Sequence, residues 1–238
     1  MKTLLRTALL GLCIAASANA AVIFDDFSDL NDTANPPWTH SSVLGSAPTW
    51  SAAGANYRLQ SNIGAFGLGY VGSFVGNVLT DSSVQLDIVD WLGNAGQAFG
   101  LAGRAADINL LGGLDGYGFA YELNTGEFVL YRVTNASLID LGNIVVALDP
   151  AKDYRLHLNI TGTTINGQAF EIGGSPDPIA NLTATDATYA SGLSGTFGYS
   201  GGGQLTDYTI DNFTIVPEPG SALLLGLCGI GGLARRRR

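Results

Sequence analysis

Between residues 21 and 216 the chain is divided into short β-type segments by glycine, asparagine, aspartate and proline, and no helix of normal length is predicted. Residues 83–88 alternate polar and apolar side chains, as a half-buried strand does. Residues 154–160 place three aliphatic side chains and a tyrosine on one face and polar side chains on the other. Glycine supplies 33 of the 238 residues, roughly twice its average share of about 7 %. The pattern predicts an all-β fold.

Turn residues between these segments predict two hairpins. Residues 116–123 and 127–133 flank Asn124-Thr125-Gly126, and residues 154–160 and 163–172 flank Thr161-Gly162. A last strand is predicted over residues 208–216. Many antiparallel strands in one unit of this length favour a two-sheet sandwich or a barrel.

The order of three short segments resembles the concanavalin-A-like lectin/glucanase (laminin-G-like) jelly roll. These segments are residues 24–27 (FDDF), 154–158 (YRLHL) and 211–215 (DNFTI). The resemblance implies an antiparallel two-sheet jelly-roll sandwich whose first and last strands pair, which would bring Asp25 and Asp26 near Asp211. That fold hosts lectins, hydrolases and adhesive modules, so it does not assign a function.

The N-terminus has the composition of a secretory signal peptide. Lys2 and Arg6 precede a nearly wholly apolar run over residues 7–16, which is too short to cross a bilayer, and residues 17–20 (SANA) form a small-residue cleavage site. We expect a cleavable signal peptide over residues 1–20 that directs the chain to the Sec machinery, with an uncleaved anchor as the alternative. The two cysteines, Cys13 and Cys228, lie in the terminal segments, so neither a disulfide framework nor a cysteine zinc site is predicted for the body.

The C-terminal segment, residues 217–238, has three parts. Pro217-Glu218-Pro219 leads into residues 221–234, which carry no charge, and four arginines follow: Arg235, Arg236, Arg237 and Arg238. As a helix the uncharged part would be roughly 21 Å long, shorter than a bilayer core of about 30 Å. The segment is either a weak anchor or a tail that is removed after transfer.

These parts, in this order, resemble the PEP-CTERM sorting tail of Gram-negative bacteria. The resemblance implies recognition by an exosortase, transient insertion of the C-terminal helix in the inner membrane, and delivery to the cell surface or the extracellular matrix. It also implies an association with exopolysaccharide. The tail covers about a tenth of the chain and is attached to many different domains, so it implies no single activity.

The charge of the body argues against nucleic acid as a partner. Six of the 11 basic residues lie outside residues 21–218, which leaves five against 20 acidic residues, from Asp25 to Glu218, and a net charge of −15 over this range. Binding of nucleic acid needs clustered lysine and arginine to neutralise phosphates.

Two short motifs lack the context that their chemistry needs. Residues 67–72 (GLGYVG) spell a dinucleotide fingerprint with Asp90 downstream, but the following residues are predicted to be extended rather than helical. Residues 198–202 (GYSGG) spell a nucleophile elbow, but no histidine follows Ser200. We therefore expect a strand at the first motif and a loop at the second.

No catalytic carboxylate pair is recognisable, and we do not expect an enzyme. The E-x-D-x-E strand motif of jelly-roll glucanases is absent, and Asp87 and Asp90 fall on opposite faces of a regular strand. Glu122 and Glu127, which would lie opposite each other across the Asn124 turn, are the fallback pair for glycoside hydrolysis. The alternative is two solvated carboxylates beside a turn.

Binding residues are predicted in two groups. Asp25, Asp26 and Asp211 are candidate ligands of a structural Ca²⁺, which takes about six to eight oxygen ligands. Trp38, Trp50 and Trp91 are candidate sugar platforms, since each lies in or beside a polar loop containing glycine or proline.

These features favour an exported, exosortase-sorted module that binds a polysaccharide or another matrix component without catalysis. A glycoside hydrolase of the jelly-roll glucanase type and a purely structural matrix protein are the alternatives. Saturable glycan binding without product would indicate the binding module, and release of reducing ends would indicate the hydrolase. Neither signal would indicate the structural protein.

Overall fold

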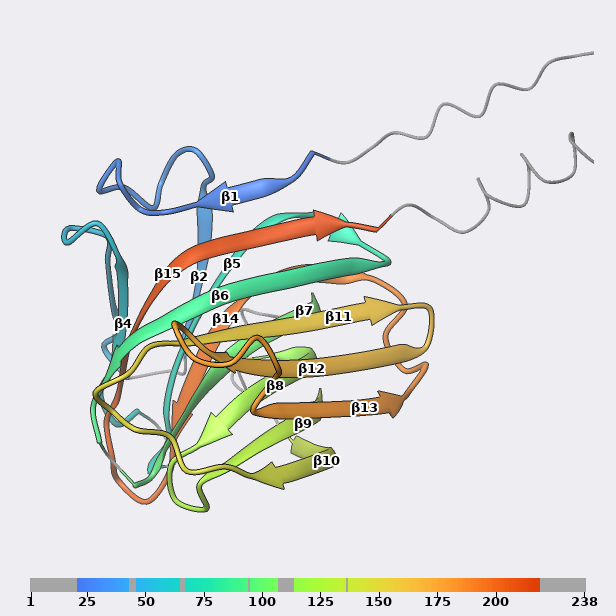
Figure 1. Ribbon diagram of the computed structural model, residues 1–238. Coiled ribbons are helices and arrows are strands. Elements are labelled where there is room, and N and C mark those ends of the chain that lie inside the picture. The colour runs from blue at the N-terminus through green and yellow to red at the C-terminus, as the bar shows by residue number, and fades with distance from the viewer. Residues whose placement is uncertain are drawn as a thin grey trace, which may run out of the picture. The chain divides into compact units, whose positions relative to one another are not determined.

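Two antiparallel β-sheets pack face to face in the computed structural model (Figure 1). The structure describes residues 21–42, 46–64, 67–93, 95–106, 114–135 and 137–218. Within these ranges every regular element is a strand, so the prediction of an all-β antiparallel sandwich is confirmed. None of the described residues forms a helix with the length and apolarity needed to span a bilayer.

The first sheet has β15 near its centre, with β1 beside it. Its order is β13 (Ala180–Thr185), β12 (Thr164–Glu171), β11 (Tyr154–Thr161), β6 (Ser82–Trp91), β15 (Thr206–Pro217), β4 (Tyr57–Ser61) and β3 (Thr49–Ser51), and β1 (Ile23–Asp25) also pairs with β15.

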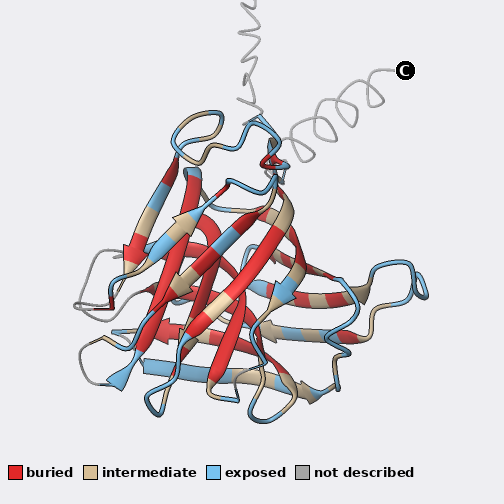
Figure 2. Cartoon of the chain, turned by 90° about the vertical axis from the view of Figure 1, so that its left-hand side faces the viewer, coloured by how far each residue is buried: buried red, intermediate tan, exposed pale blue. Residues whose placement is uncertain are grey.

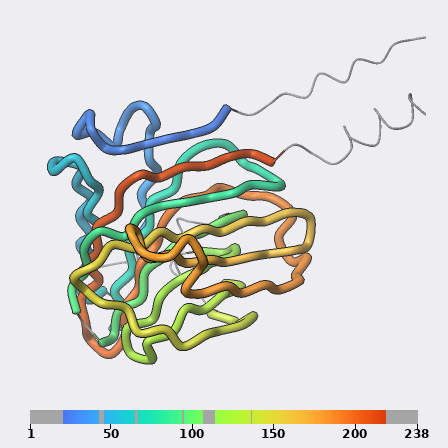
Figure 3. The backbone as a smooth tube through the Cα atoms, viewed as in Figure 1, coloured from blue at the N-terminus to red at the C-terminus, as the bar shows by residue number. Residues whose placement is uncertain are grey.

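The second sheet has seven strands. Its order is β10 (Ser137–Val145), β9 (Glu127–Thr134), β8 (Asp115–Glu122), β7 (Gln97–Ala106), β14 (Gly192–Ser200), β5 (Gly69–Leu79) and β2 (Trp38–Ser42). The chain passes between the sheets repeatedly, so strands distant in sequence become neighbours, as the tube in Figure 3 shows.

The strands predicted from alternation are present. Residues 83–88 lie in β6, and residues 154–160 lie in β11. Both predicted hairpins form, as β8–β9 and β11–β12, and β15 covers the predicted last strand. The first and last strands pair as the jelly-roll resemblance implied, with Phe24 opposite Thr214 and Asp25 opposite Phe213.

The main core lies between the sheets, and buried residues run along most of their central strands (Figure 2). In β11 the side chains of Leu156, Leu158 and Ile160 are buried there, while Arg155 and His157 alternate with them. Close packing also needs glycine at one crossing: a Cβ on Gly167 of β12 would lie 2.4 Å from the ring of Phe119 of β8. The two sheets therefore approach through a residue without a side chain.

The two ends of the sandwich differ in what they carry. Ala21–Glu218 form one compact unit, and β1 begins at the end where β15 finishes (Figure 1). At this terminal end Pro217 lies opposite Ser82, and the Glu218 amide donates to the Asp81 carbonyl at 3.1 Å. The opposite end holds the start of β7 and the finish of β8 and β14.

A buried arginine organises the terminal end. Arg104 is 3 % exposed and donates to the carbonyls of Thr80 and Tyr189 and to the Asp81 carboxylate. Asp81 also accepts from the Gly162 amide at 2.9 Å. One ion pair thus ties the β5–β6 turn to the β11–β12 turn and to the segment before β14.

Candidate functional site

An open pocket of about 510 Å³ lies at the end of the sandwich opposite the terminal end. Three loops and the strand ends beside them form it. The residues lining this distal pocket are Ala95, Gly96, Gln97, Ala98, Glu122, Asn124, Tyr199, Gly201, Gly202 and Gln204.

Backbone hydrogen bonds hold the loops of the distal pocket together. The Gly201 amide donates to the Gly96 carbonyl at 3.0 Å, and the Leu123 amide donates to the Gln97 carbonyl at 3.0 Å. A Cβ on Gly96 would lie 2.7 Å from the Gly201 carbonyl oxygen, so this approach needs glycine. The pocket is therefore built on a fixed backbone rather than on free loops.

Glu122 is the carboxylate of the distal pocket. In the sheet, Tyr199, Ala98, Glu122 and Glu127 lie opposite one another in a row across β14, β7, β8 and β9. The small Ala98 lies between Tyr199 and Glu122, and the Tyr199 hydroxyl donates to Glu122 Oε1 at 2.6 Å. The Tyr131 hydroxyl, from β9, donates to the same oxygen.

Both tyrosines stay protonated and act as donors. Burial, together with the adjacent phenol and the Glu122 carboxylate, raises the pKa of Tyr131. Burial and the hydrogen bond to Glu122 raise the pKa of Tyr199. Two hydroxyls therefore fix Glu122 Oε1, while among the described residues Oε2 has the Thr125 hydroxyl, at 3.5 Å, as its partner.

The rim of the distal pocket offers amide groups. Asn124 lies in the β8–β9 turn and Gln204 in the loop between β14 and β15, and both residues are exposed. Gln97 has a different role, since its side-chain amide donates to the Leu92 carbonyl and its carbonyl accepts from the Asp207 amide. The pocket thus presents a carboxylate, a phenol ring and two exposed amides to a ligand.

The structure brings Glu122 and Glu127 together across the β8–β9 hairpin, as the sequence predicts. They lie directly opposite on neighbouring strands and point to the same face of the sheet. Glu122 lines the distal pocket, and Glu127 is not among its lining residues. Their catalytic role stays a prediction.

None of the three tryptophans is among the residues that line the distal pocket. Trp38 is 7 % exposed, packs on Phe213, and donates its indole N–H to Asp25 at 2.8 Å. Trp50 stacks on His40 with ring centres 4.2 Å apart and donates to the Gly72 carbonyl. Trp91 packs against the core rings of Phe99 and Tyr154. Their assignment as sugar platforms stays a prediction.

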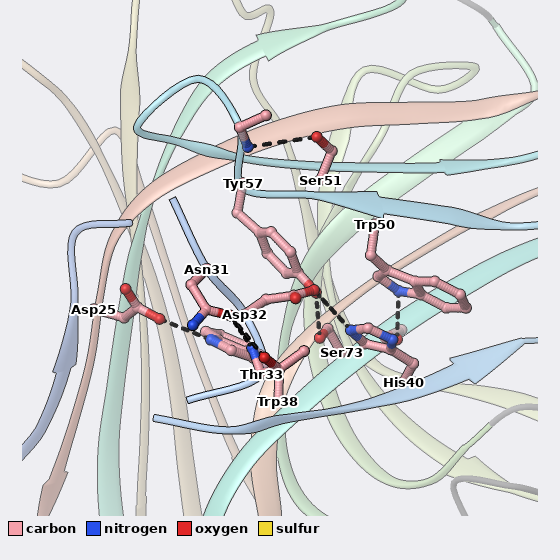
Figure 4. A network of polar contacts seen from close by, with 12 residues as sticks. Asp25, Asn31, Asp32, Thr33, Trp38, His40, Trp50, Ser51, Tyr57 and Ser73 are labelled. Carbon is pink, nitrogen blue, oxygen red and sulfur yellow. Dashed lines mark hydrogen bonds and ion pairs between the residues drawn. The ribbon is translucent and has the colours of Figure 1, made fainter. Parts of the chain in front are cut away.

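A second polar network links the loop after β1 to three strands (Figure 4). The Tyr57 hydroxyl contacts Asp32 Oδ2, His40 Nε2 and the Ser73 hydroxyl at 3.1, 3.1 and 2.9 Å. The His40 ring also pairs with Asp32 at 3.0 Å. Tyr57 and Ser73 have no exposed surface, so a substrate cannot reach the serine. The network holds the edge of the sandwich together.

The carboxylates proposed for calcium do not form a cluster that fits the ion. The oxygens of Asp25 accept from the Phe27 amide and the Trp38 indole, and burial raises the pKa of Asp25. Asp26 accepts from the Ser28 amide, and Asp211 from the Asn212 amide. Within the described ranges, no group of three or more His, Cys, Asp or Glu side chains is placed to hold a metal.

The sorting motif begins inside the folded body. Pro217 is the last residue of β15, and Glu218 is bonded to Asp81. Pro219, the four terminal arginines, the predicted C-terminal helix and the predicted signal peptide lie outside the described residues.

Sequence reasoning missed Tyr199, Asn124 and Gln204 as pocket residues, and Tyr131 as a donor to Glu122. A signal existed at residues 198–202, which the sequence predicts as a loop. Residues 198–200 are instead the end of strand β14, and Gly201 and Gly202 begin the loop that lines the distal pocket beside Tyr199. In the other glycine motif, residues 69–72 lie in strand β5, which continues to Leu79.

The C-terminal residues match a known sorting signal. Residues 216–238 match the PEP-CTERM protein-sorting motif. No curated protein matches the chain.

Solved structures share the fold at low sequence identity. A carbohydrate-binding module, CBM66 from Bacillus subtilis, aligns with a TM-score of 0.57 and 17 % identity over 75 % of this chain and 94 % of its own. A prokaryotic β-1,3-1,4-glucanase (lichenase) from a mouse hindgut metagenome aligns with a TM-score of 0.59 and 9 % identity, over 83 % of this chain and 99 % of its own. The Ca²⁺-bound exoplasmic/lumenal domain of VIP36 aligns with a TM-score of 0.56 and 8 % identity, over 83 % of this chain and 90 % of its own. The protein therefore carries a PEP-CTERM sorting motif after an all-β body of the concanavalin-A-like jelly-roll type.

Proposed function

We propose that this protein is an exported, exosortase-sorted module of a Gram-negative cell surface or extracellular matrix that binds carbohydrate, linked to exopolysaccharide, without catalysis. The observation that carries the proposal is the distal pocket, where a fixed carboxylate, a phenol ring and exposed amides surround an open volume of about 510 Å³. Similar solved structures include a carbohydrate-binding module, which supports the same reading at the level of the fold.

The chemistry of the distal pocket suits a sugar. Glu122 Oε2 accepts hydrogen bonds from sugar hydroxyls, and the amides of Asn124 and Gln204 both donate and accept. The ring of Tyr199 supplies an apolar surface beside these groups. A few placed polar groups against an aromatic surface give orientation and specificity.

The location of the distal pocket also suits a surface module. The sorting motif starts at the terminal end, and the distal pocket lies at the other end of the strands. After transfer by the Sec machinery, and before the exosortase acts, the C-terminal helix would hold the protein at the inner membrane. The ligand-binding end then faces away from the point of attachment. The division into a signal peptide (1–20), a body (21–216) and a tail (217–238) remains part of this proposal.

Glycoside hydrolysis is the second candidate, because Glu122 and Glu127 lie opposite each other on one face. A retaining hydrolase needs its two carboxyl groups about 5–5.5 Å apart, on either side of the bond to be cut. Here only Glu122 lines the distal pocket, and two tyrosines bind one of its oxygens. These contacts favour binding over catalysis.

A glycan array and a polysaccharide-degradation assay on the purified protein test the proposal. We expect saturable binding without release of reducing ends, and a Gln204→Ala, Asn124→Ala double variant that binds more weakly. Release of reducing ends that is lost in Glu127→Gln would establish the hydrolase instead. If neither binding nor release of reducing ends is detected, the remaining interpretation is a purely structural matrix protein.

A further inference from the structure

Every lysine and arginine of the body already has an acidic partner. The pairs are Arg58–Asp207, Arg104–Asp81, Arg132–Asp186, Lys152–Glu171 and Arg155–Asp87. These five account for all lysine and arginine between residues 21 and 216. The body therefore has no spare lysine or arginine with which to neutralise another carboxylate.

Glu122 is a carboxylate that this arrangement leaves without a cation. Its hydrogen-bond partners among the described residues are the neutral hydroxyls of Tyr131, Tyr199 and Thr125. Glu127, directly opposite, adds a second negative charge rather than a positive one. Partly buried charges in proteins usually have a partner of opposite sign, so the partner of Glu122 is expected to come from the ligand.

The geometry leaves one oxygen of Glu122 for that partner. Both tyrosines donate to Oε1, and Oε2 has only the Thr125 contact at 3.5 Å. A metal ion is a poor candidate, because the described residues provide no group of three or more metal-binding side chains and Ca²⁺ needs about six to eight oxygens. An ammonium group needs only one carboxylate and a few acceptors, and the carbonyls of Asn124 and Gln204 are nearby at the rim of the pocket.

From these observations, and resting on the proposed carbohydrate-binding function, we infer that the distal pocket selects glycans that carry a free protonated amine. The amine of a de-N-acetylated amino sugar pairs with Glu122 Oε2, while neighbouring hydroxyls contact the amides. Acidic sugars such as uronic acids are excluded, because Glu122, Glu127 and the net charge of −15 repel them.

Matched oligosaccharides test this selectivity. Titration calorimetry on the purified protein compares a glucosamine oligomer with an N-acetylglucosamine oligomer of the same length and with an oligogalacturonate. We expect the glucosamine oligomer to bind about ten-fold more tightly than its acetylated form, equivalent to about 1.4 kcal/mol. The acidic oligomer should not bind.

Two substitutions separate a specific ion pair from attraction to an acidic surface. Glu122→Gln keeps the size and an acceptor for the tyrosines, and should bind both amino-sugar oligomers equally. Asp177→Asn, in an exposed turn, removes one charge far from the pocket residues in sequence and should keep the ten-fold difference. Melting curves of both variants confirm that each is folded.

The outcomes distinguish this inference from the function on which it rests. Equal binding of both oligomers by the unsubstituted protein, or a preference that survives Glu122→Gln, overturns the amine selectivity while carbohydrate binding stands. If no glycan binds in either experiment, the proposed function itself is rejected.

Discussion

Asp81 at the terminal end and Glu122 at the distal pocket are two carboxylates in contrasting surroundings. Asp81 accepts from a guanidinium and from a backbone amide, and its carbonyl holds Glu218. Within the described part of the chain, the donors to Glu122 are neutral hydroxyls, and its side chain lines an open pocket. The carboxylate of Asp81, where the chain enters and leaves the sandwich, is neutralised by an arginine of the protein. The carboxylate of Glu122, at the other end, is left for a ligand. The first arrangement contributes to stability, and the second is suited to binding.

The largest effect is expected at Arg104. Arg104→Met leaves Asp81 without its cation and leaves two carbonyls without a donor, so the free energy of unfolding should fall by about 3–5 kcal/mol. Urea unfolding measures this change. Arg58→Met is the control, because its ion pair with Asp207 is half exposed and should contribute at most about 1 kcal/mol. Equal losses in the two variants would remove the contrast between buried and exposed pairs.

Acid should destabilise the terminal end through Asp186. Burial alone would raise the pKa of this carboxyl, but hydrogen bonds from Thr188, Tyr117 and Arg132 outweigh it and lower the pKa to about 2. Because the folded pKa is below the ordinary aspartate value of 3.8, this stabilisation is present above about pH 4 and is lost as the pH falls toward 2.

Unfolding free energies measured from about pH 5 down to about pH 2 check the role of Asp186. Asp186→Asn should flatten the acid limb of the stability curve. Asp177→Asn, in an exposed turn, should leave the limb as steep as in the unsubstituted protein. An unchanged limb in Asp186→Asn would show that other carboxylates cause the acid response.

A smaller effect is expected at the distal pocket. Tyr131→Phe removes one donor to Glu122, but Tyr199 still donates to the same oxygen, so the loss should be about 0.5–1.5 kcal/mol. Thermal and urea unfolding measure the loss. A cost as large as that of Arg104→Met would mean that Glu122 serves stability, and the comparison between the two ends would fail.

Calcium should have no effect on stability. Asp25 uses both oxygens for internal hydrogen bonds, and its carboxylate partners are also bonded locally. The melting temperature should therefore be the same in a chelator and in excess Ca²⁺. A rise with calcium would support the predicted site, and Asp211→Asn would then show whether this residue is a ligand.

The fold was predictable because its signal is local. Alternation in residues 154–160 reports burial on one face of β11, and the Asn124-Thr125-Gly126 turn places Glu122 opposite Glu127. The distal pocket was predictable only at Glu122. Tyr199 reaches Glu122 across β7, and this neighbourhood depends on the pairing of Tyr199 in β14 with Ala98 in β7, 101 residues apart in sequence, which no local pattern reports.

Trp38 also shows that sequence alone does not report contacts made by strand pairing. Trp38 adjoins a polar loop, which is typical of a binding platform, yet its indole donates to the buried Asp25 and its ring packs on Phe213. That contact joins residues brought together by the pairing of β1 with β15. Sequence proximity to a loop therefore did not report the direction of the side chain.

The pairing of Pro217 with Ser82 and the bond from Glu218 to Asp81 leave no spacer between the sandwich and the start of the sorting motif. The length of strand β6 then sets the separation of the two ends, since its 10 residues extend about 33 Å from Ser82 to the end that carries the pocket. A flexible linker would let a binding site sample a volume around its anchor. The fold instead fixes the distance between the last described residues of the motif, Pro217 and Glu218, and the distal pocket.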